Sequence, residues 1–257
     1  MPRQGNQSKE IKMKTEEFIE RIKGEKRVFV ERTDELRASI PLGEYSDGEY
    51  ALSHRDGADE RYRHTCVTGA MRAEFISRLL LTLTGLYSNS EAVFIVVSPN
   101  LYYGQFMKLK SVDVTIPFIT TARDIPPVLE AVRAIAEMRK AKPSKTKTFL
   151  VLDGIETVLP EEERFNLDCY RPFFDAATGS GIEIITGVDL SKSVFAGYPS
   201  VFVGIGNCLV APSVGGEMDV TYVEMDGSMS TPKKCTYPSL PTIAECIERR
   251  NAETYAD

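Results

Sequence analysis

No stretch of this sequence is apolar for long enough to cross a membrane. A spanning helix needs roughly 20 consecutive apolar residues, and the chain of 257 residues has no such run. Residues 1–6 likewise lack the hydrophobic region of a signal peptide. We therefore expect a cytoplasmic chain without direct membrane insertion. A membrane anchor on a longer parent protein stays open, because such a chain can be the soluble part of a membrane-anchored protein.

Residues that commonly bind metals or form disulfides are scarce. The chain has two histidines, both in one charged region, and five cysteines without any C-x-x-C pair. This odd number of dispersed cysteines favours reduced, mostly buried thiols. We expect no zinc site and no other metal site. The residues concerned are His54, His64, Cys66, Cys169, Cys208, Cys235 and Cys246.

Positive charge is also in deficit. The formal net charge is −6 and the isoelectric point is about 5.2, whereas a domain that grips a nucleic-acid backbone is usually basic on at least one face. Two short basic stretches, 61–64 and 142–147, are best explained as solvated loops. We therefore do not expect DNA as a partner.

The chain is long enough to form one large core. A domain of this size buries roughly three quarters of its unfolded surface. Apolar positions at helical spacing between residues 11 and 22, followed by Gly24, predict a short linker helix near the N-terminus. We therefore divide the chain into a tail with a linker helix, 1–24, and one domain, 25–257.

Strand and helix patterns alternate along this domain. Continuous apolar runs are typical of strands buried on both faces of a parallel sheet. Apolar residues at helical spacing predict the helices, one of which begins after an N-cap at Asp124. Asp-Gly pairs at 47–48 and 226–227 predict hairpins. We expect strands at 27–30, 38–42, 64–68, 92–97, 148–153, 182–186, 200–203, 207–211 and 220–223, and helices at 70–83, 125–140, 162–177 and 242–253.

One unit of strand, turn and helix is central to the sequence. Strand-forming residues lead into Gly69, which permits the chain to reverse before an apolar helical pattern. A phosphate-binding loop has this architecture, and its motif G-x-x-x-x-G-K-[ST] supplies loop amides, a lysine and a hydroxyl to phosphates and Mg²⁺. Counted from Gly69, those last three positions hold Glu74, Phe75 and Ile76. Without the second glycine, we expect the loop to wind into an extra helical turn.

In their order and spacing, several segments resemble the FtsK/SpoIIIE family of motor domains, above all the domains repeated in the EssC/EccC ATPases of type VII secretion. The resemblance covers about residues 36–215 and rests on segments 40–43, 64–69, 97–100, 132–140, 149–153 and 177–186. It implies an α/β domain with the RecA/FtsK-like P-loop NTPase fold. In that fold a mostly parallel central sheet is flanked by helices, here with small β-hairpin additions.

The same resemblance shows where this chain departs from active members. Family members that hydrolyse ATP carry Asp-Glu at the end of the Walker B strand, whereas here Asp153 is followed by Gly154. Glu156 can replace the missing carboxylate only if the turn bends unusually. The sensor strand leads into Gly187 and Asp189, where the family often has Thr-Gln. The resemblance therefore implies a site without catalytic residues.

Nucleotide binding should be weak at such a site. Each lost charge-assisted bond from the lysine or the hydroxyl is worth ~1.5 to 3 kcal/mol, and a glutamate beside the phosphates adds repulsion. A micromolar site binds with ~8 kcal/mol, so a loss of ~5 kcal/mol leaves millimolar affinity or weaker. We therefore expect neither ATP nor Mg²⁺ as a cofactor. The vestigial nucleotide-binding residues are Gly69, Arg72, Glu74, Phe75, Ile76, Asp153, Gly154 and Glu156.

These residues also have plain structural explanations, which the sequence leaves open. Gly69 can form a bare turn, and Asp153 can organise a loop. Phe75 and Ile76 can be core residues. Arg72, like its neighbour at position 74, can lie in a solvated first turn.

The resemblance implies that the chain works by contact. Type VII secretion ATPases carry several motor domains in tandem, some of them degenerate. Our leading interpretation is a terminal pseudo-ATPase module whose partners are the other motor domains of the assembly and a helical secretion-signal peptide. A partly apolar pocket near Met71, Phe75 and Ile76 is the candidate peptide site. The alternatives are an ATP-dependent DNA or protein translocase motor that is active only within an oligomer, and a scaffold that binds nothing there.

Overall fold

The computed structural model describes residues 41–53, 64–110, 112–160, 177, 179–189, 208–222, 228–237 and 242–253. Several expected features fall outside these residues. They are the linker helix and the domain division at 24–25, the strands at 27–30 and 200–203, nearly all of the charged segment before residue 64, nearly all of the helix at 162–177, and the turn at 226–227.

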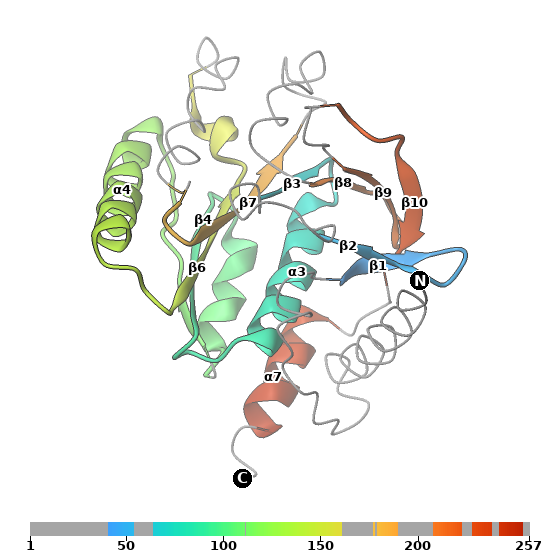
Figure 1. Cartoon of the computed structure of the whole chain (residues 1–257), viewed down its shortest axis with the longest axis horizontal. Coiled ribbons are helices and arrows are strands. Elements are labelled where there is room, and N and C mark those ends of the chain that lie inside the picture. Colours follow the sequence, from blue (N-terminus) through green and yellow to red (C-terminus); the bar gives the residue numbers. More distant parts are fainter. Residues whose placement is uncertain are drawn as a thin grey trace, which may run out of the picture.

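The described strands form one ten-stranded sheet in the order β2-β1-β10-β9-β8-β3-β7-β6-β4-β5 (Figure 1). Their bounds are β1 Pro41–Tyr45, β2 Tyr50–Leu52, β3 Thr65–Thr68, β4 Ala92–Val97, β5 Asp113–Thr115, β6 Lys147–Asp153, β7 Ile182–Val188, β8 Cys208–Pro212, β9 Glu217–Tyr222 and β10 Lys233–Thr236. The expected strands in the described part are confirmed, apart from shifts of a few residues at their ends.

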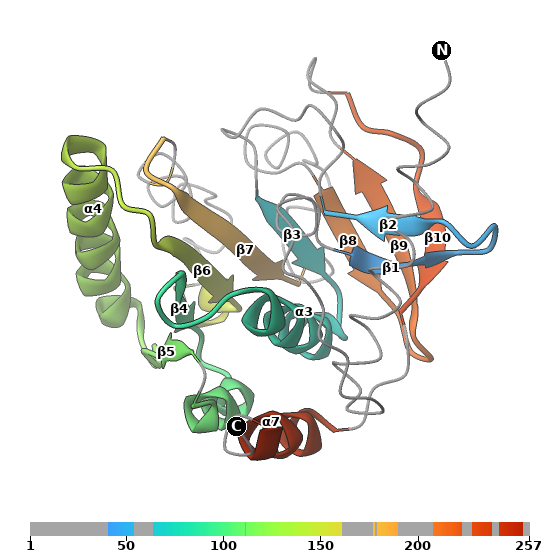
Figure 2. The same ribbon diagram turned by 60° about the horizontal axis from the view of Figure 1, so that its bottom comes forward.

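The sheet has a parallel half and an antiparallel half. All pairings from β8 through β3, β7, β6 and β4 to β5 are parallel, and those from β8 through β9, β10 and β1 to β2 are antiparallel. Figure 2 shows the antiparallel strands curling away at one end. Since parallel strands end at the same edge, the carboxyl ends of β3, β4, β6 and β7 lie close together.

Helices cover both faces of the parallel half. The helices in the described part are α3 Arg72–Leu86, α4 Ile125–Ala141 and α7 Ile243–Glu253, with shorter 3₁₀ segments η2 Leu101–Lys108, η3 Ala122–Asp124 and η4 Ile155–Val158. Phe149 and Val151 of β6 point into the core that contains α3, while Leu150 and Leu152 point into the core that contains α4. Alternate residues of β6 thus contact helices on opposite faces of the sheet, and Figure 2 shows α3 and α4 apart on the two sides of the parallel strands.

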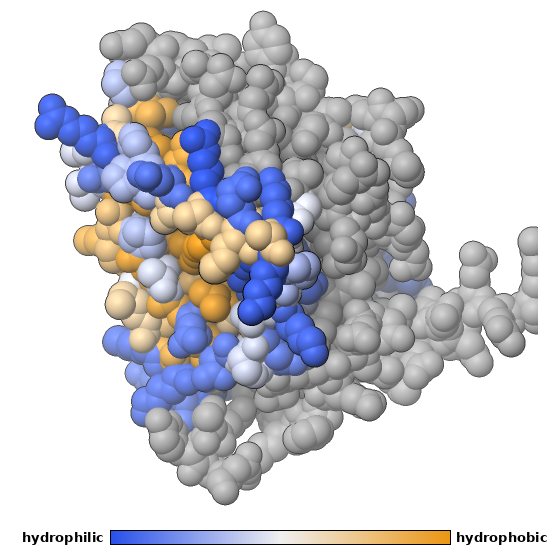
Figure 3. Space-filling view, turned by 60° about the vertical axis from the view of Figure 1, so that its left-hand side comes forward, coloured by the Kyte–Doolittle hydropathy of each residue, from blue (hydrophilic) through white to orange (hydrophobic). Residues whose placement is uncertain are grey.

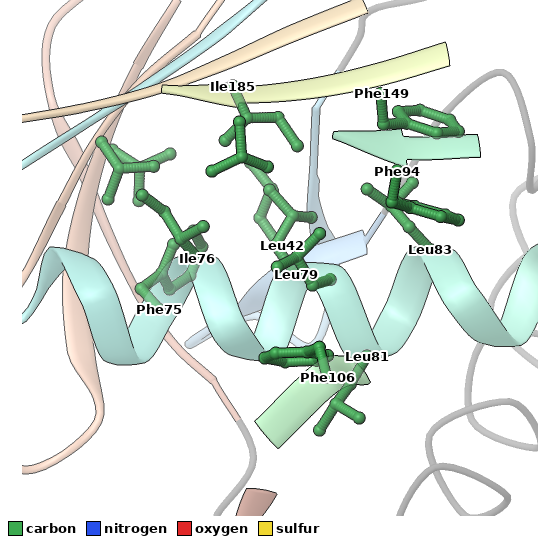
Figure 4. Close-up of a cluster of buried hydrophobic side chains, with 14 of the residues drawn as sticks. Leu42, Phe75, Ile76, Leu79, Leu81, Leu83, Phe94, Phe106, Phe149 and Ile185 are labelled. Carbon is green, nitrogen blue, oxygen red and sulfur yellow. The ribbon is translucent and has the colours of Figure 1, made fainter. Parts of the chain in front are cut away.

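The α3 face holds the larger core (Figure 4). Leu79 and Leu83 of α3 are 4% and 0% exposed. Phe94 of β4 stacks on Phe149 of β6 with ring centroids 5.1 Å apart. Within this layer Asn251 joins α7 to the end of η2. Its side chain donates to the Lys108 carbonyl and accepts a hydrogen bond from the Lys110 amide. α3 is therefore fixed between the sheet and the closing helix.

The α4 face is packed more shallowly. Only Ile125, Val132, Ala136 and Arg139 are buried in α4, and Met138 is 63% exposed. On the described part of this side of the molecule, hydrophobic residues lie among hydrophilic ones (Figure 3).

Two sequence-based details need correction. Asp124 precedes α4 but makes no side-chain bond to its amides; its carboxylate accepts the amides of Thr120 and Thr121 at 2.7 Å instead. The hairpin of β8 and β9 was not expected, although Gly215 and Gly216, with φ of 96° and 86°, form its turn. The Asp47-Gly48 hairpin is confirmed, because β1 and β2 pair around it.

The cysteines agree with the expected reduced state where the structure describes them. Cys66, Cys235 and Cys246 are buried thiols that form no disulfide. The side chains of Cys169 and Cys208 lie outside the described part. No helix among the described residues is long and apolar enough to cross a membrane.

Candidate functional site

The turn between β3 and α3 forms around Gly69. Its φ of +90° lies in the left-handed region, which glycine adopts without strain. The Arg72 amide donates to the Gly69 carbonyl at 3.3 Å, and the Phe75 amide donates to the Met71 carbonyl at 3.1 Å. α3 therefore begins at Arg72, ahead of the position where the motif has its lysine, as expected for an extra helical turn. The Phe75 amide is engaged within the helix and is not presented at its N-terminus.

Arg72, the first residue of α3, forms an ion pair with Asp153, the last residue of β6. Its Nε lies 2.8 Å from Asp153 Oδ1, and its Nη1 donates to the Gly69 carbonyl at 3.5 Å. The Arg72 and Asp153 side chains are 17% and 2% exposed. A positive charge thus lies at the carboxyl ends of the parallel strands, where sheets of this type bind their ligands.

Two more side chains hold the Asp153 carboxylate. Tyr103 of η2 donates its hydroxyl to Asp153 Oδ2 at 3.1 Å, and Ser98, which follows β4, also hydrogen-bonds it. Burial raises the pKa of Asp153 above its ordinary value, although Arg72, Tyr103 and Ser98 oppose this rise. Burial and the neighbouring Asp153 raise the pKa of Tyr103 well above its ordinary value. The tyrosine hydroxyl therefore stays protonated and remains a donor.

Glu156 and Asp189 add negative charge around Arg72. Glu156 lies in η4 and is 5% exposed, and its Oε1 accepts the Asp189 amide at 3.3 Å. Burial alone lowers the pKa of Arg72, but the charges of Asp153, Glu156 and Asp189 outweigh it, so this pKa lies above its ordinary value. Arg72 therefore keeps its charge and faces three acidic residues.

Two glycines let the backbone approach this ion pair. The Gly154 amide donates to the Gly187 carbonyl at 3.0 Å, which joins the ends of β6 and β7. A Cβ at Gly187 would clash with Asp153 Oδ1 and would lie 2.8 Å from Ile76 Cδ1. Gly154 has a φ of +70°, and a Cβ there would lie 3.2 Å from Arg72 Nη2. Glycine at both positions is thus explained by close packing around Arg72 and Asp153.

The residues at the lysine and hydroxyl positions of the motif lie in the core. Phe75 is 2% exposed and Ile76 is 0% exposed, and both lie in the hydrophobic cluster (Figure 4). The Phe75 ring packs edge-on against Tyr237, with ring centroids 5.7 Å apart. Their interpretation as core residues is confirmed. The candidate pocket at Met71, Phe75 and Ile76 must be corrected accordingly, because only Met71 is partly exposed.

The Glu74 side chain forms an ion pair within α3. Its Oε1 accepts the Arg78 Nη2 at 2.7 Å across one turn of α3. The Glu74 side chain is 36% exposed, in accord with a solvated first turn. The same explanation is wrong for Arg72, whose side chain is 17% exposed and pairs with Asp153.

Sequence reasoning missed Tyr103 as a site residue. The only available signal was its place shortly after β4, whose carboxyl end lies beside that of β6. Ser98 belonged to the noted Ser-Pro-Asn turn, but its bond to Asp153 was not foreseen. Among the residues that the structure describes, no group of three or more His, Cys, Asp or Glu is arranged to hold a metal ion.

Comparison with known proteins identifies the fold. No family model matches the chain, and no curated protein sequence matches it significantly. Among solved structures, EccC (ATPases 2 and 3) of Thermomonospora curvata in complex with a signal sequence peptide matches with a TM-score of 0.56 and 13% identity over 78% of this chain. EssC (ATPases 2 and 3) from Geobacillus thermodenitrificans matches with a TM-score of 0.55 and 13% identity over 85%.

A third match is the pCW3 conjugation coupling protein TcpA in its monomer form with ATPγS, with a TM-score of 0.53 and 11% identity over 88% of this chain. The present chain spans 41%, 49% and 73% of these three proteins, in the order given. The chain thus has the fold of a P-loop ATPase-like domain of the EssC/EccC type, as the sequence resemblance implied.

Proposed function

We propose that this chain is a catalytically degenerate P-loop ATPase-fold domain that works by contact with other proteins. The observation that carries the proposal is the ion pair of Arg72 with Asp153 at the ligand-binding edge of the sheet. In an active domain of this fold, the corresponding edge receives phosphates and Mg²⁺.

The residues present do not fit a nucleotide with its metal. The Asp153 carboxylate accepts bonds from Arg72, Tyr103 and Ser98, so its oxygens are already used. Phe75 and Ile76 point into the core instead of offering an ammonium group and a hydroxyl. We derive no catalytic step from this site.

We further propose that the domain is a terminal module of a membrane-associated type VII secretion translocase, in which it recognises substrate or regulates its neighbours. The similar Thermomonospora curvata EccC structure contains a signal sequence peptide, which supports peptide recognition on this fold. Apolar side chains also remain exposed on η2, beside the site: Leu101 is 75%, Tyr102 is 44% and Met107 is 62% exposed. Other motor domains of the same assembly and a helical signal peptide are the proposed partners.

Calorimetric titration with Mg-ATP tests the absence of nucleotide binding. We expect no heat of binding in the micromolar range, because the charge and the amides that hold phosphates are engaged elsewhere. The matched control is Asp153→Asn, which removes the carboxylate that a metal would need. Micromolar binding by the natural chain that is lost in Asp153→Asn contradicts the proposal.

The second candidate is an ATP-dependent translocase motor that is active only within an oligomer. The match to TcpA, whose structure holds ATPγS, favours it. A neighbouring subunit can supply an arginine, but it cannot supply loop amides that are engaged within α3.

Exchange of Phe75 to Lys and Ile76 to Thr is a poor test of the second candidate, because both residues lie in the core. ATPase activity of the full assembly with Asp153→Asn in this domain decides the matter: we expect no change, and a large loss supports the second candidate.

A further inference from the structure

The charge of Arg72 does not suit its position in the helix. The N-terminus of a helix carries a partial positive charge, so acidic residues are favoured in the first turn and basic residues are disfavoured. Arg72 is nevertheless the first residue of α3, and its guanidinium is turned back toward the Gly69 carbonyl and Asp153. A contact outside the helix must therefore account for its placement.

The surroundings of Arg72 and Asp153 bring together five parts of the chain. Arg72 belongs to α3 and contacts the turn after β3 through the Gly69 carbonyl. Asp153 ends β6, and Tyr103 attaches η2 to its second oxygen. β7 comes close enough at Gly187 that a Cβ there would clash with the carboxylate. One partly buried ion pair thus lies where a ligand would otherwise contact the same parts of the chain.

We infer that the Arg72 guanidinium is a cation supplied by the chain itself. It fills the phosphate-loop crevice, the site around Gly69, Asp153 and Gly187, and fixes the carboxyl ends of β6 and β7 against α3. The inference rests on the proposed function only in taking this crevice as the nucleotide site of the fold. The conformation of the crevice is then set by the sequence and does not respond to nucleotide or metal.

Arginine is suited to this position. Its guanidinium is planar, is charged at all relevant pH values and presents several donors in a rigid fork. Here Nε binds the carboxylate while Nη1 reaches a backbone carbonyl. A lysine has one ammonium group on a flexible stem and cannot hold both acceptors in the same way. Arg72→Lys should therefore recover only part of what Arg72→Met loses.

Thermal unfolding of the whole chain tests the inference. Arg72→Met leaves the Asp153 carboxylate buried without its cation, so we expect the melting temperature to fall by roughly 10 °C. The matched control is Arg78→Met, on the same helix, whose guanidinium has its own carboxylate partner at 2.7 Å and lies over the Tyr237 ring at 4.7 Å. That carboxylate is 36% exposed and is not left buried without its cation, so the control should lose at most about 5 °C. Equal losses in the two variants overturn the inference.

The double variant Arg72→Met with Asp153→Asn separates an ion pair from simple packing. Neutralising the carboxylate removes the unpaired charge, so the double variant should melt above Arg72→Met. A melting temperature below that of the single variant contradicts a role for charge.

Amide hydrogen exchange supplies a local readout. The Gly154 amide bonds to the Gly187 carbonyl beside the ion pair, and its exchange should rise at least about tenfold in Arg72→Met. The amides that pair β9 with β10 lie in the antiparallel half and should change much less. An equal rise in both regions indicates only global destabilisation and overturns the local role.

None of these measurements uses nucleotide. If Mg-ATP binds while the variant series behaves as expected, the proposed function fails, and so does the claim that Arg72 fills the crevice; only the fixing of the strand ends by Arg72 then stands. If Mg-ATP does not bind while Arg72→Met behaves like Arg78→Met, the inference fails and the proposed function stands.

Discussion

The two ends of α3 each meet an arginine, but under opposite electrostatic conditions. At the C-terminal end, Arg250 of α7 donates to the Leu81 carbonyl and to Thr84 Oγ1. α3 has no basic residue in its own last turn, so Arg250 supplies the positive charge that the end of a helix attracts. At the N-terminal end, Arg72 opposes the helix dipole and is held by Asp153.

The difference separates two uses of the same side chain. Arg250 attaches α7 to α3, and its charge stabilises the C-terminal end of α3. Arg72 disfavours its own helix, and its contribution comes from the strand ends that it joins to α3. Disturbing the two ends should therefore have different consequences in size and in pH dependence.

The largest effect is expected from closing the space at the N-terminal end. Gly187→Ala adds a Cβ that clashes with Asp153 Oδ1 and approaches Ile76 Cδ1, so we expect a loss of roughly 3 kcal/mol in the free energy of unfolding. Chemical denaturation measures it. Gly104→Ala is the control, since its Cβ would meet only Phe118 at an ordinary 3.7 Å. A Gly187→Ala variant as stable as Gly104→Ala shows that the strand ends can move apart freely.

A smaller effect is expected at the C-terminal end. Arg250→Met removes the charged donor to the Leu81 carbonyl and to Thr84, at a partly exposed site, so we expect a loss of about 1 kcal/mol and a melting temperature lower by about 2 to 4 °C. The neighbouring Arg249→Met is the control, because Arg249 is exposed. If Arg250→Met costs as much as Arg72→Met, the contrast between the two ends is wrong.

The smallest effect concerns the pH dependence of stability that Asp153 adds at the N-terminal end. Burial raises the pKa of Asp153 above 3.8 in the folded state, so the folded protein binds its proton more tightly than the unfolded chain does. Its contribution to stability is therefore fully present below pH 3.8 and is lost as the pH rises through the folded pKa. The free energy of unfolding should be measured at a series of pH values for the natural chain and for Asp153→Asn. The value for the natural chain minus that for the variant should fall as the pH rises through this window.

Asp124 provides the opposite case as a control. The amides of Thr120 and Thr121 lower its pKa below 3.8. Its contribution is present above pH 3.8 and is lost as the pH falls through the lowered pKa. The two stability differences, natural chain minus Asp153→Asn and natural chain minus Asp124→Asn, should change with pH in opposite directions. If both rise with pH, Arg72 outweighs burial and the assigned direction of the Asp153 pKa shift is wrong.

Much of the fold could be predicted from local patterns. The apolar runs at 92–97 and 148–153 are β4 and most of β6, and the helical spacing before residue 83 continues to Leu86 as α3. The β8–β9 hairpin was missed because its turn, with Gly215 and Gly216, lacks the Asp-Gly pair that signalled the first hairpin. Asp124 was predicted to accept the first amides of α4, but its carboxylate accepts the nearer amides of Thr120 and Thr121.

The sequence by itself determined the alternation of strands and helices, the glycine turn before α3 and the replacement of the motif's lysine and hydroxyl by Phe75 and Ile76. Those features are local, since strand and helix periods and glycine torsions depend on near neighbours. Only the tertiary structure decided that Arg72 binds Asp153, 81 positions away, and that Tyr103 completes the carboxylate's bonds. Such pairings depend on which strand ends meet at one edge of the sheet, and no periodicity in the chain encodes that meeting.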